Sequence, residues 1–396
     1  MVEAVPDSEW ESMQHFISNS PWDHRALVDQ LAKDANELIG GSSDSFLVVD
    51  ESAFSKKGRR SVGVARQWNG RLGKVDNCQV GVFGALGCRD KVTLTDMRLY
   101  LPKEWTDDKV RCRKAGVPEE AMKYRSKIDL ALDIIGNAQD NNLDFHWVGA
   151  DSFYGRNSHF RRSLAAKGLV YMVDIPKDTT IYLEDPKPCV PSRKSKKGRV
   201  PQKLQTHAVG FRLDKWVEDQ PQEAFTTHTI RQGTKGPMKA RVLHRIVWLW
   251  DGKSPEAEKV HLLASITGSQ KGKIKYSVSN APEETSTERL AYMQAQRYWV
   301  ERALQNGKSE AGMADYQVRG WTAWHHHMAM VMLAMLFMLE TRIKNQNQYE
   351  LLSTADVKTL LQHFLPKRQI STEEVIKQME IRHRKRKKDI NLYRKI

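Results

Sequence analysis

Two short apolar runs that each end in an aspartate are the feature that most constrains the fold of this chain. Residues 46–49 (FLVV) lead into Asp50, and residues 145–150 (FHWVGA) lead into Asp151. The segment HFRRSLAAKGLVYMVDI, residues 159–175, then predicts a helix that ends at Gly168 and a further strand. This order of strand, helix and strand predicts an α/β fold, in which ligand-binding groups gather at the carboxyl ends of strands.

The charge balance indicates a polyanionic partner. The 396 residues include 63 Lys and Arg against 48 Asp and Glu, which gives a net charge of +15. A field of this sign attracts nucleic acid and supports salt-sensitive binding to its phosphate backbone. On charge alone, a basic enzyme that binds no nucleic acid remains the alternative. The four cysteines form no CxxC pair, so we expect neither a disulfide scaffold nor a structural zinc site.

The sequence predicts neither export nor a membrane span. The N-terminal residues MVEAVPDSEWESMQ lack the basic stretch and apolar stretch of a secretory signal. The longest apolar run, residues 328–339, is shorter than the about 20 residues needed to cross a bilayer. We therefore expect this run to form a buried helix of a cytoplasmic protein that does not contact a membrane.

The remaining pattern divides the chain into regions. Residues 8–40 predict two short helices joined around Pro21, residues 62–68 and 78–88 predict two more strands, and a helix is expected over residues 121–138 after a polar loop. We predict an N-terminal helical region that is a candidate for binding DNA ends (1–44), the first part of a catalytic core (45–175), a β-rich insertion (176–285), core helices that carry a third acid (286–345) and a C-terminal helical region with a basic tail (346–396).

The third acid stands between two cations in a predicted helix. In RYWVERALQNGKSEAG, Arg297, Glu301 and Lys308 are four and seven residues apart, so at about 100° per residue they share one helical face. On spacing alone, a solvated face with salt bridges is the more frequent structure. An acid that ends a strand, such as Asp50 or Asp151, is likewise more often a helix cap or a turn former.

Several motifs in order resemble one family. The stretches FLVVDESAFSKKG, SVGVARQWNGRLGKVDNCQVGV, VGADSFYG, VSNAPEE, RYWVERALQNGKSEAGM and DYQVRGWTAWHHHMAM are similar to insertion-sequence transposases of the DDE superfamily. Within the superfamily the chain resembles the group with a Tyr, Arg, Glu, Lys signature. Arg297, Glu301 and Lys308 match its last three positions, and Gln294 stands in place of the tyrosine. Glu310 competes for the third acid, but it follows the lysine and loses the match.

The resemblance implies a fold and a metal site. The expected fold is a ribonuclease-H-like mixed sheet flanked by helices, with the β-rich insertion between the second and third acids. Asp50, Asp151 and Glu301 are the expected catalytic residues and ligands of two Mg²⁺ ions, for which Mn²⁺ can substitute, and Asp50 is expected to bridge both ions. Carboxylate oxygens are the ligands that Mg²⁺ prefers, and two ions suit phosphoryl transfer. Arg297 and Lys308 are expected to contact DNA phosphates.

The resemblance also implies a function. The expected reaction is metal-dependent cleavage at insertion-sequence ends and strand transfer into target DNA, of the cut-and-paste type. The expected partners are double-stranded DNA, both terminal inverted repeats and target, and a second copy of the chain that forms a homodimer on two paired ends. The expected location is the prokaryotic cytoplasm, at the nucleoid. Two alternatives remain: a ribonuclease-H-like nuclease without strand transfer, and a non-catalytic DNA-binding protein derived from a transposase.

Further DNA contacts are predicted outside the acids. Tyr154 follows Asp151 and is a candidate contact, although it also suits a role in shaping the strand-to-helix turn. A basic loop supplies further candidates, Arg193, Lys194, Lys196 and Lys197. The tail over residues 382–395 could either clamp DNA or extend into solvent.

Two clusters of ring side chains favour structural roles. Trp248 and Trp250 alternate on a predicted strand, where core packing is more frequent than stacking on an unpaired base. His325, His326 and His327 are adjacent in a predicted helix and point about 100° apart, so they cannot all face one metal ion.

Overall fold

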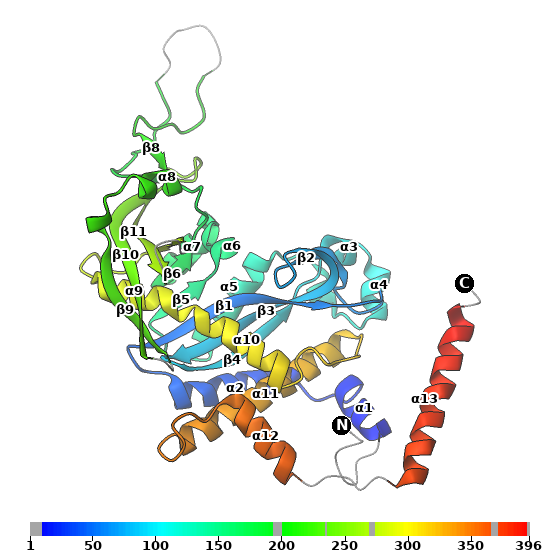
Figure 1. Cartoon of the computed structure of the whole chain (residues 1–396). Coiled ribbons are helices and arrows are strands. Elements are labelled where there is room, and N and C mark those ends of the chain that lie inside the picture. The colour runs from blue at the N-terminus through cyan, green and yellow to red at the C-terminus, as the bar shows by residue number, and fades with distance from the viewer. Residues whose placement is uncertain (1–9, 193–199, 234–235, 269–273, 366–370, 394–396) are drawn as a thin grey trace.

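A computed structural model describes residues 10–192, 200–233, 236–268, 274–365 and 371–393. Within these residues, twelve strands form one mixed sheet with helices on both faces (Figure 1), which confirms the predicted α/β class and agrees with a ribonuclease-H-like fold. The helices are, in chain order, α1 (Trp10–Ser18), α2 (His24–Ile39), α3 (Lys103–Thr106), α4 (Lys109–Lys114), α5 (Lys127–Asp140), α6 (Ser152–Gly155), α7 (Ser158–Ala166), α8 (Leu213–Glu218), α9 (Thr287–Gln296), α10 (Tyr298–Glu310), α11 (Trp321–Asn345), α12 (Thr354–Phe364) and α13 (Thr372–Tyr393).

The centre of the sheet is parallel. Strand β1 (Ser45–Ser55) pairs in parallel with β5 (Trp147–Ala150), and β5 pairs in parallel with β6 (Tyr171–Asp174). All four residues of β5 are buried, as is usual for a strand that helices cover on both faces. Because the three strands run in the same direction, their carboxyl ends lie along one edge of the sheet.

Antiparallel strands complete the sheet beside β1. Strand β3 (Lys74–Cys88) lies between β1 and β2 (Ala65–Asn69), and it also pairs with β4 (Lys91–Leu99). The three strands predicted from the apolar runs are present as β1, β2 and β3. The sequence did not predict β4, because polar side chains interrupt its apolar residues even though they are buried, namely Thr93, Thr95 and Asp96.

The region expected to be a β-rich insertion contributes six strands that extend the same sheet. Strand β12 (Ile274–Ser279) pairs antiparallel with β6, and β11 (Glu258–Thr267) and β10 (Gly236–Leu249) follow outward. This half of the sheet forms the upright, green part of Figure 1. The outer positions belong to β7 (Thr180–Tyr182), β8 (Gly210–Arg212) and β9 (Thr226–Gly233).

Alternate residues of β1 enter two separate hydrophobic cores. Phe46 and Val48 pack with residues of α2, α10 and α11 on one face of the sheet. Leu47 and Val49 pack with residues of α5 and α7 on the opposite face. Because side chains alternate along a strand, this short apolar run anchors both layers of helices and fixes the position of the residue that follows it, Asp50.

Helix α5 begins six residues later than predicted, at Lys127. The Ser126 hydroxyl accepts a hydrogen bond from the Asp129 N–H, and the Asp129 carboxylate accepts one from the Ser126 N–H. This capping box defines the helix start. The residues before it form a separate 3-10 turn (Glu119–Met122), and the segment predicted as a loop contains the short helices α3 and α4.

The apolar run over residues 328–339 lies inside α11. With 25 residues, α11 is the one helix of the described chain that is long and apolar enough to cross a membrane, but 61% of its most apolar window is buried within the protein. It packs against β4 and α2. The prediction of a buried helix at this run is therefore confirmed.

The three adjacent histidines at the start of α11 face different surroundings. His325 lies within hydrogen-bond distance of a carbonyl one turn earlier in α11, and His327 of a carbonyl in the loop before α11. His326 lies within hydrogen-bond distance of two carbonyls, one near the end of α1 and one in the turn before α2. They point in separate directions, as predicted.

The two ends of the chain are helical. Helices α1 and α2 confirm the helix pair predicted for residues 8–40, and the Asp23 side chain caps α2. At the other end, α13 stands apart from the rest of the molecule in Figure 1, and most of its described side chains are exposed.

Candidate active site

Asp50 and Asp151 lie side by side at the carboxyl edge of the parallel strands. Val49 of β1 is in register with Ala150 of β5, so the next residue of each strand is one of the two aspartates. The sequence suggested that two acids at strand ends could converge, and the structure brings these two together. Asp50 is not the end of its strand, however, because the pairing of β1 with β3 continues to Ser55.

Local hydrogen bonds hold both carboxylates. Asp151 accepts hydrogen bonds from the N–H groups of Phe153 (2.9 Å) and Tyr154 (3.4 Å), so it is also the N-cap of α6. Asp50 accepts one from the N–H of Glu51 at 2.7 Å. Asp151 therefore caps a helix, as acids at strand ends often do, and it also lies beside a second acid.

The surroundings of Asp50 and Asp151 disfavour the ionised form of both carboxyl groups. Burial, followed by the neighbouring carboxylate of Asp151, raises the pKa of Asp50 to about 7. Burial also raises the pKa of Asp151, and the Arg297 guanidinium opposes that shift. A cation bound between the two aspartates would stabilise their ionised forms.

Asp174 is a further carboxylate at the same edge, and it was not predicted from the sequence. Ala150 of β5 is in register with Val173 of β6, so Asp174 follows at the end of the third parallel strand. The apolar run LVYMV before Asp174 resembles the runs before Asp50 and Asp151, and this shared pattern was the available signal.

A close approach between α6 and β6 packs these strand ends together. A Cβ atom on Gly155 would lie 2.0 Å from the carbonyl oxygen of Asp174, so only glycine fits this position without a shift of the backbone. The turn that follows Asp151 therefore contacts the end of β6.

Arg297 contacts both Glu301 and Asp50, and so connects Glu301 to this edge of the sheet. Arg297 lies at the junction of α9 and α10, and its Nη2 is 2.6 Å from Glu301 Oε1 while its Nη1 is 3.7 Å from Asp50 Oδ2. The Arg297 side chain is only 20% exposed, whereas that of Glu301 is 53% exposed. Arg297 was predicted to contact a DNA phosphate, but here its guanidinium faces carboxylates.

Two lysines contact aromatic rings that pack against each other, Phe54 and Tyr316. The Lys308 ammonium lies 5.5 Å from the centre of the Phe54 ring, and that of Lys56 lies 3.5 Å from the centre of the Tyr316 ring. Burial lowers the pKa of Lys56 to about 8, and burial followed by Arg71 lowers the pKa of Lys308. Within the described residues, neither lysine forms an ion pair with a carboxylate. The sequence analysis named Lys308 and missed Lys56.

Two other candidates, Tyr154 and Glu310, have surroundings that do not suit their predicted roles. Tyr154 is fully buried in the core beneath α6, so the structure argues against the predicted contact with DNA. Glu310, the competing third acid, forms an ion pair with Lys358 of α12 instead. The candidates of the basic loop, Arg193, Lys194, Lys196 and Lys197, lie outside the described residues.

The two tryptophans of the insertion are partly buried. The Trp250 indole N–H donates to the Ser254 carbonyl at 2.8 Å, and Lys259 lies over the ring of Trp248. Both rings therefore have partners within the protein, as expected for structural residues.

The side chains at this edge of the sheet offer carboxylate oxygens, which suit a hard divalent cation. Asp50 and Asp151 supply adjacent buried carboxylates, and carboxylate oxygen is the donor that Mg²⁺ prefers. As they stand, no three His, Cys, Asp or Glu side chains of the described residues are grouped closely enough to hold a metal ion. Binding by all three predicted acids therefore requires Glu301 to exchange Arg297 for an ion.

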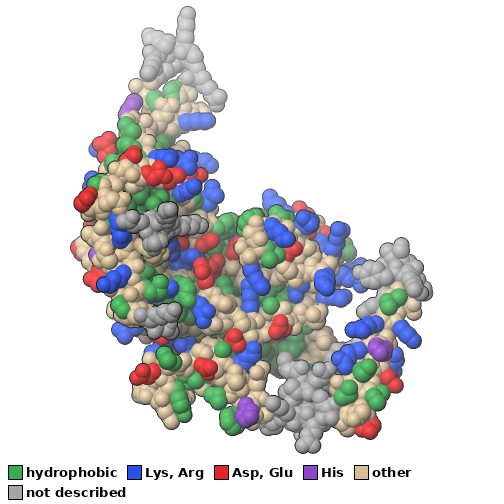
Figure 2. All heavy atoms as spheres, viewed as in Figure 1, with side chains coloured by type: hydrophobic (Ala, Val, Ile, Leu, Met, Phe, Trp, Pro, Cys, Tyr) green, Lys and Arg blue, Asp and Glu red, His purple; other side chains and the backbone are tan. Residues whose placement is uncertain are grey.

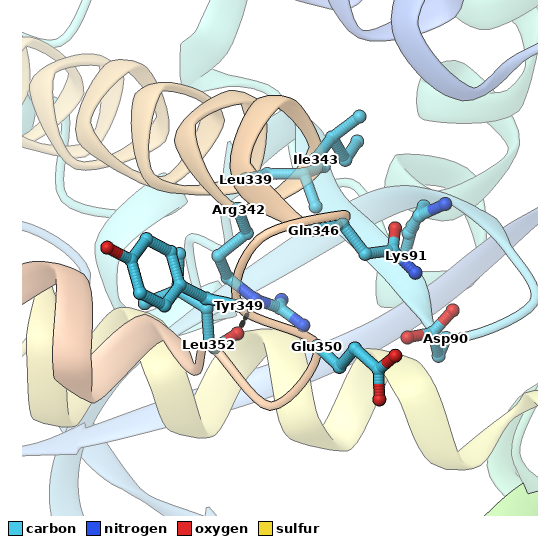
Figure 3. Close-up of a pocket in the computed structure, with 9 residues that line it drawn as sticks. All are labelled: Asp90, Lys91, Leu339, Arg342, Ile343, Gln346, Tyr349, Glu350 and Leu352. Carbon is cyan, nitrogen blue, oxygen red and sulfur yellow. Dashed lines mark hydrogen bonds between the residues drawn. The ribbon is translucent and has the colours of Figure 1, made fainter.

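Two cavities of the described residues lie away from Asp50. Figure 3 shows a pocket at the end of α11, where Arg342 donates a hydrogen bond to the Leu352 carbonyl. A groove of about 1000 Å³, lined by Tyr298 and Arg302 among others, runs along α10, and neither cavity includes Asp50. Figure 2 shows instead that acidic and basic side chains lie close together near the centre of one face of the molecule.

The fold and the acids at its edge define a ribonuclease-H-like α/β protein with a cluster of acidic side chains where β5 and β6 end. The chain belongs to a family described as DDE superfamily endonucleases, whose model matches residues 1–237. The matched residues include Asp50 and Asp151 and end before Glu301.

A curated relative extends this comparison. A probable transposase for insertion sequence element IS701 from Microchaete diplosiphon is 30% identical to this chain over 168 residues. The match covers 42% of this chain and 40% of that relative, so the chain spans less than half of the relative's length.

Proposed function

We propose that this protein is a DNA transposase that cuts the ends of an insertion sequence and transfers them into target DNA. The observation that carries the proposal is the pairing of β1 with β5, which places Asp50 beside Asp151 at the carboxyl edge of the sheet. Membership of the DDE superfamily endonucleases and the similarity to a probable transposase support it.

Three side chains would hold the metal ions. Asp50, Asp151 and Glu301 would bind two Mg²⁺ ions, or Mn²⁺ in their place, and Asp50 is best placed to be shared because it lies near both other acids. When bound, such ions neutralise charge on the reacting phosphate and favour the deprotonated nucleophile. Water is the attacking group in the first cut and a DNA 3′-hydroxyl in the transfer, so the protein needs no nucleophile of its own.

Lysines without an ion-pair partner in the described residues would bind the DNA backbone, and one of them, Lys308, lies near enough to Asp50 to feel its charge. Lys308 and Lys56 are partly buried ammonium groups without a carboxylate partner in the described chain, and a phosphate at this position would stabilise both charges. Arg71, which lies near Lys308, would add a third charge to the same surface. Arg297 contributes less to this surface because carboxylates surround it.

The proposal extends to the assembly. Two element ends must be inserted together, so we propose a homodimer on two paired ends, with double-stranded terminal repeats and target DNA as its substrates. The cytoplasm, at the nucleoid, is the compartment in which those substrates are found.

Labelled DNA tests the proposal directly. Duplexes that carry the ends of the encoding element are incubated with the protein, Mg²⁺ and a target plasmid, and the products are separated as nicks, hairpins and joined molecules. We expect cleavage at the element end and joined products with the wild-type protein. Asp50→Ala and Glu301→Ala should each abolish both products while leaving binding to the duplex intact. Full activity of either variant would refute the assignment of that acid.

The same assay separates the main alternative. A nuclease on this core needs the same acids and metal, so it would give Mg²⁺-dependent cleavage without joined molecules. A non-catalytic DNA-binding protein would shift the labelled duplex without cutting it.

A further inference from the structure

Asp174 has more polar partners than either aspartate of the proposed metal site. Its Oδ2 lies 2.8 Å from Arg297 Nε and 3.3 Å from Lys275 Nζ, and its Oδ1 accepts a hydrogen bond from the Ser277 hydroxyl at 2.6 Å. The Gln294 side chain in turn donates to the Ser277 hydroxyl at 2.8 Å. Asp174 is thus held by strand β12 on one side and holds Arg297 on the other.

The network also explains the residue that departs from the family signature. Gln294 occupies the position of the signature tyrosine, and it is only 4% exposed. The backbone carbonyl of Gln294 accepts a hydrogen bond from Lys275, and its side-chain amide donates one to the Ser277 hydroxyl. In this chain the position therefore supports Asp174 rather than facing solvent.

Arg297 divides its guanidinium between this network and the proposed metal ligands. Nε faces Asp174, whereas Nη2 and Nη1 face Glu301 and Asp50. Burial opposes its charge, but the carboxylates of Asp174, Glu301 and Asp50 raise its pKa above the usual value, so it stays charged. A permanent cation at this place competes with any metal ion for Asp50 and Glu301.

We propose that Asp174 is a positioning residue that anchors Arg297 and thereby controls how readily Asp50 and Glu301 accept divalent ions. This inference rests on the proposed function, because it assumes that Asp50 and Glu301 are metal ligands. When Asp174 is present, it holds the Nε edge of the Arg297 guanidinium at the end of β6 and neutralises part of its charge there. Without the anchor, the whole guanidinium can close over Asp50 and Glu301 and exclude the ions.

Mn²⁺ binding to the full-length protein in the absence of DNA tests the inference. Free Mn²⁺ is measured by electron paramagnetic resonance during titration, with Asp50→Asn as the reference that removes the site. Asp174→Asn should weaken Mn²⁺ binding about tenfold, because an unanchored cation then competes at close range. Ser277→Ala keeps every charge and removes the hydrogen bond to Asp174 together with the one from Gln294, so it should weaken binding about threefold.

The effect should depend on Arg297. In an Arg297→Gln background the competing cation is absent, so Asp174→Asn and Ser277→Ala should each change the Mn²⁺ affinity by less than about twofold. Asp44→Asn is the matched control: Asp44 has similar exposure and pairs with two arginines, Arg89 and Arg289, but it does not contact Arg297. It should leave the affinity unchanged.

Two outcomes would overturn the inference. One is an equal loss of Mn²⁺ affinity in both backgrounds, since that would indicate a direct effect of the Asp174 charge on the ions. The other is an affinity that neither Asp174→Asn nor Ser277→Ala changes, although Asp50→Asn abolishes binding. Failure of the proposed function looks different, because the wild-type protein and Asp50→Asn would then bind Mn²⁺ equally, or the wild type would bind Mn²⁺ and cut no DNA.

Discussion

At the scale of single residues, Asp50 is an ionisable group that the fold holds where ionisation is costly. It ends the apolar run that anchors both cores, and it faces Asp151 across one strand spacing. Its raised pKa means that the folded protein binds a proton at pH values where the unfolded chain has released it. Without metal, this carboxylate should therefore destabilise the fold at neutral and alkaline pH.

The substitution Asp50→Asn should stabilise the metal-free protein in a pH-dependent way. The folded-state pKa of about 7 lies above the ordinary value of 3.8 for an aspartate, so the stability of the wild type should fall as pH rises between these values. We expect Asn to raise the free energy of unfolding by roughly 1–3 kcal/mol at pH 8 and by less at pH 5. Thermal unfolding in EDTA at both pH values measures this, and a larger gain at pH 5 would contradict the account.

Tyr154 should act as a core residue. Its ring is fully buried and its hydroxyl has no hydrogen-bond partner within the described chain. Removing an unsatisfied buried hydroxyl should be neutral or stabilising by up to about 1 kcal/mol, so Tyr154→Phe should fold normally and bind DNA with unchanged affinity. A gel-shift titration beside a melting curve checks both points. Weaker DNA binding at unchanged stability would restore the predicted DNA contact.

Part of the candidate site could be predicted residue by residue. Asp50 and Asp151 were accessible because an apolar run that ends in an acid is a local pattern, and Asp174 follows the same pattern. The continuation of β1 past Asp50 was not accessible, because it depends on pairing with β3. The contact of Arg297 with Asp174 was not accessible, because it joins distant segments that only the fold brings together. The burial of Lys56 against Tyr316 is of the same kind.

At the scale of elements, the turn after Asp151 depends on the contact between α6 and β6. The atom that a Gly155 side chain would meet is a backbone carbonyl, which cannot rotate away. We expect Gly155→Ala to displace α6 from β6, to cost roughly 2–4 kcal/mol of stability and to move Asp151. Chemical denaturation and the cleavage assay measure the two effects, and a variant with wild-type stability would contradict the close approach.

Gly136 provides the matched control for this substitution. It lies inside helix α5, where an added Cβ would meet only the end of the Lys167 side chain, at 3.9 Å. Gly136→Ala should therefore stabilise the protein by about 0.5–1 kcal/mol, as expected for a glycine in a helix interior.

Elements could be predicted where their apolar pattern is continuous. The runs that became β1, β3 and β5, the helix pair at the N-terminus and the buried helix α11 all have that pattern. Strand β4 was missed because its buried side chains include threonines and an aspartate with partners on other elements, such as Arg25 of α2 and Asn137 of α5 around Asp96. The start of α5 was misplaced because the capping box at Ser126 competes with a helical pattern that extends further upstream.

At the scale of the whole molecule, one sheet joins the core and the inserted region. Its continuity depends on the pairing of β6 with β12, the last strand of the inserted region, and most of that region separates the two strands along the chain. Apolar patterns predict strands but not their partners, so the sequence indicated a β-rich region without indicating that it extends the central sheet. The same pairing supplies the Ser277 hydroxyl to Asp174 and so connects the inserted region to the proposed site.

Helix α13 should contribute to DNA binding and little to folding. Its described side chains are mostly exposed, and its second half contains the run RHRKRKK. Deleting residues 371–396 should leave the midpoint of thermal unfolding within about 2 °C of the wild type, because few contacts are lost. It should weaken binding to duplex DNA and reduce its dependence on log salt concentration by roughly 2–4. An unchanged salt dependence would show that the tail only extends into solvent.

The central claim is that Asp50, Asp151 and Glu301 hold the metal ions that act on DNA. Anomalous diffraction from crystals of the protein with Mn²⁺ and an element-end duplex tests this most directly. We expect two anomalous peaks, one between Asp50 and Asp151 and one between Asp50 and Glu301, with Glu301 released from Arg297. Peaks elsewhere in a cleavage-competent complex, or a Glu301 still paired with Arg297 while the ions are bound, would contradict the account.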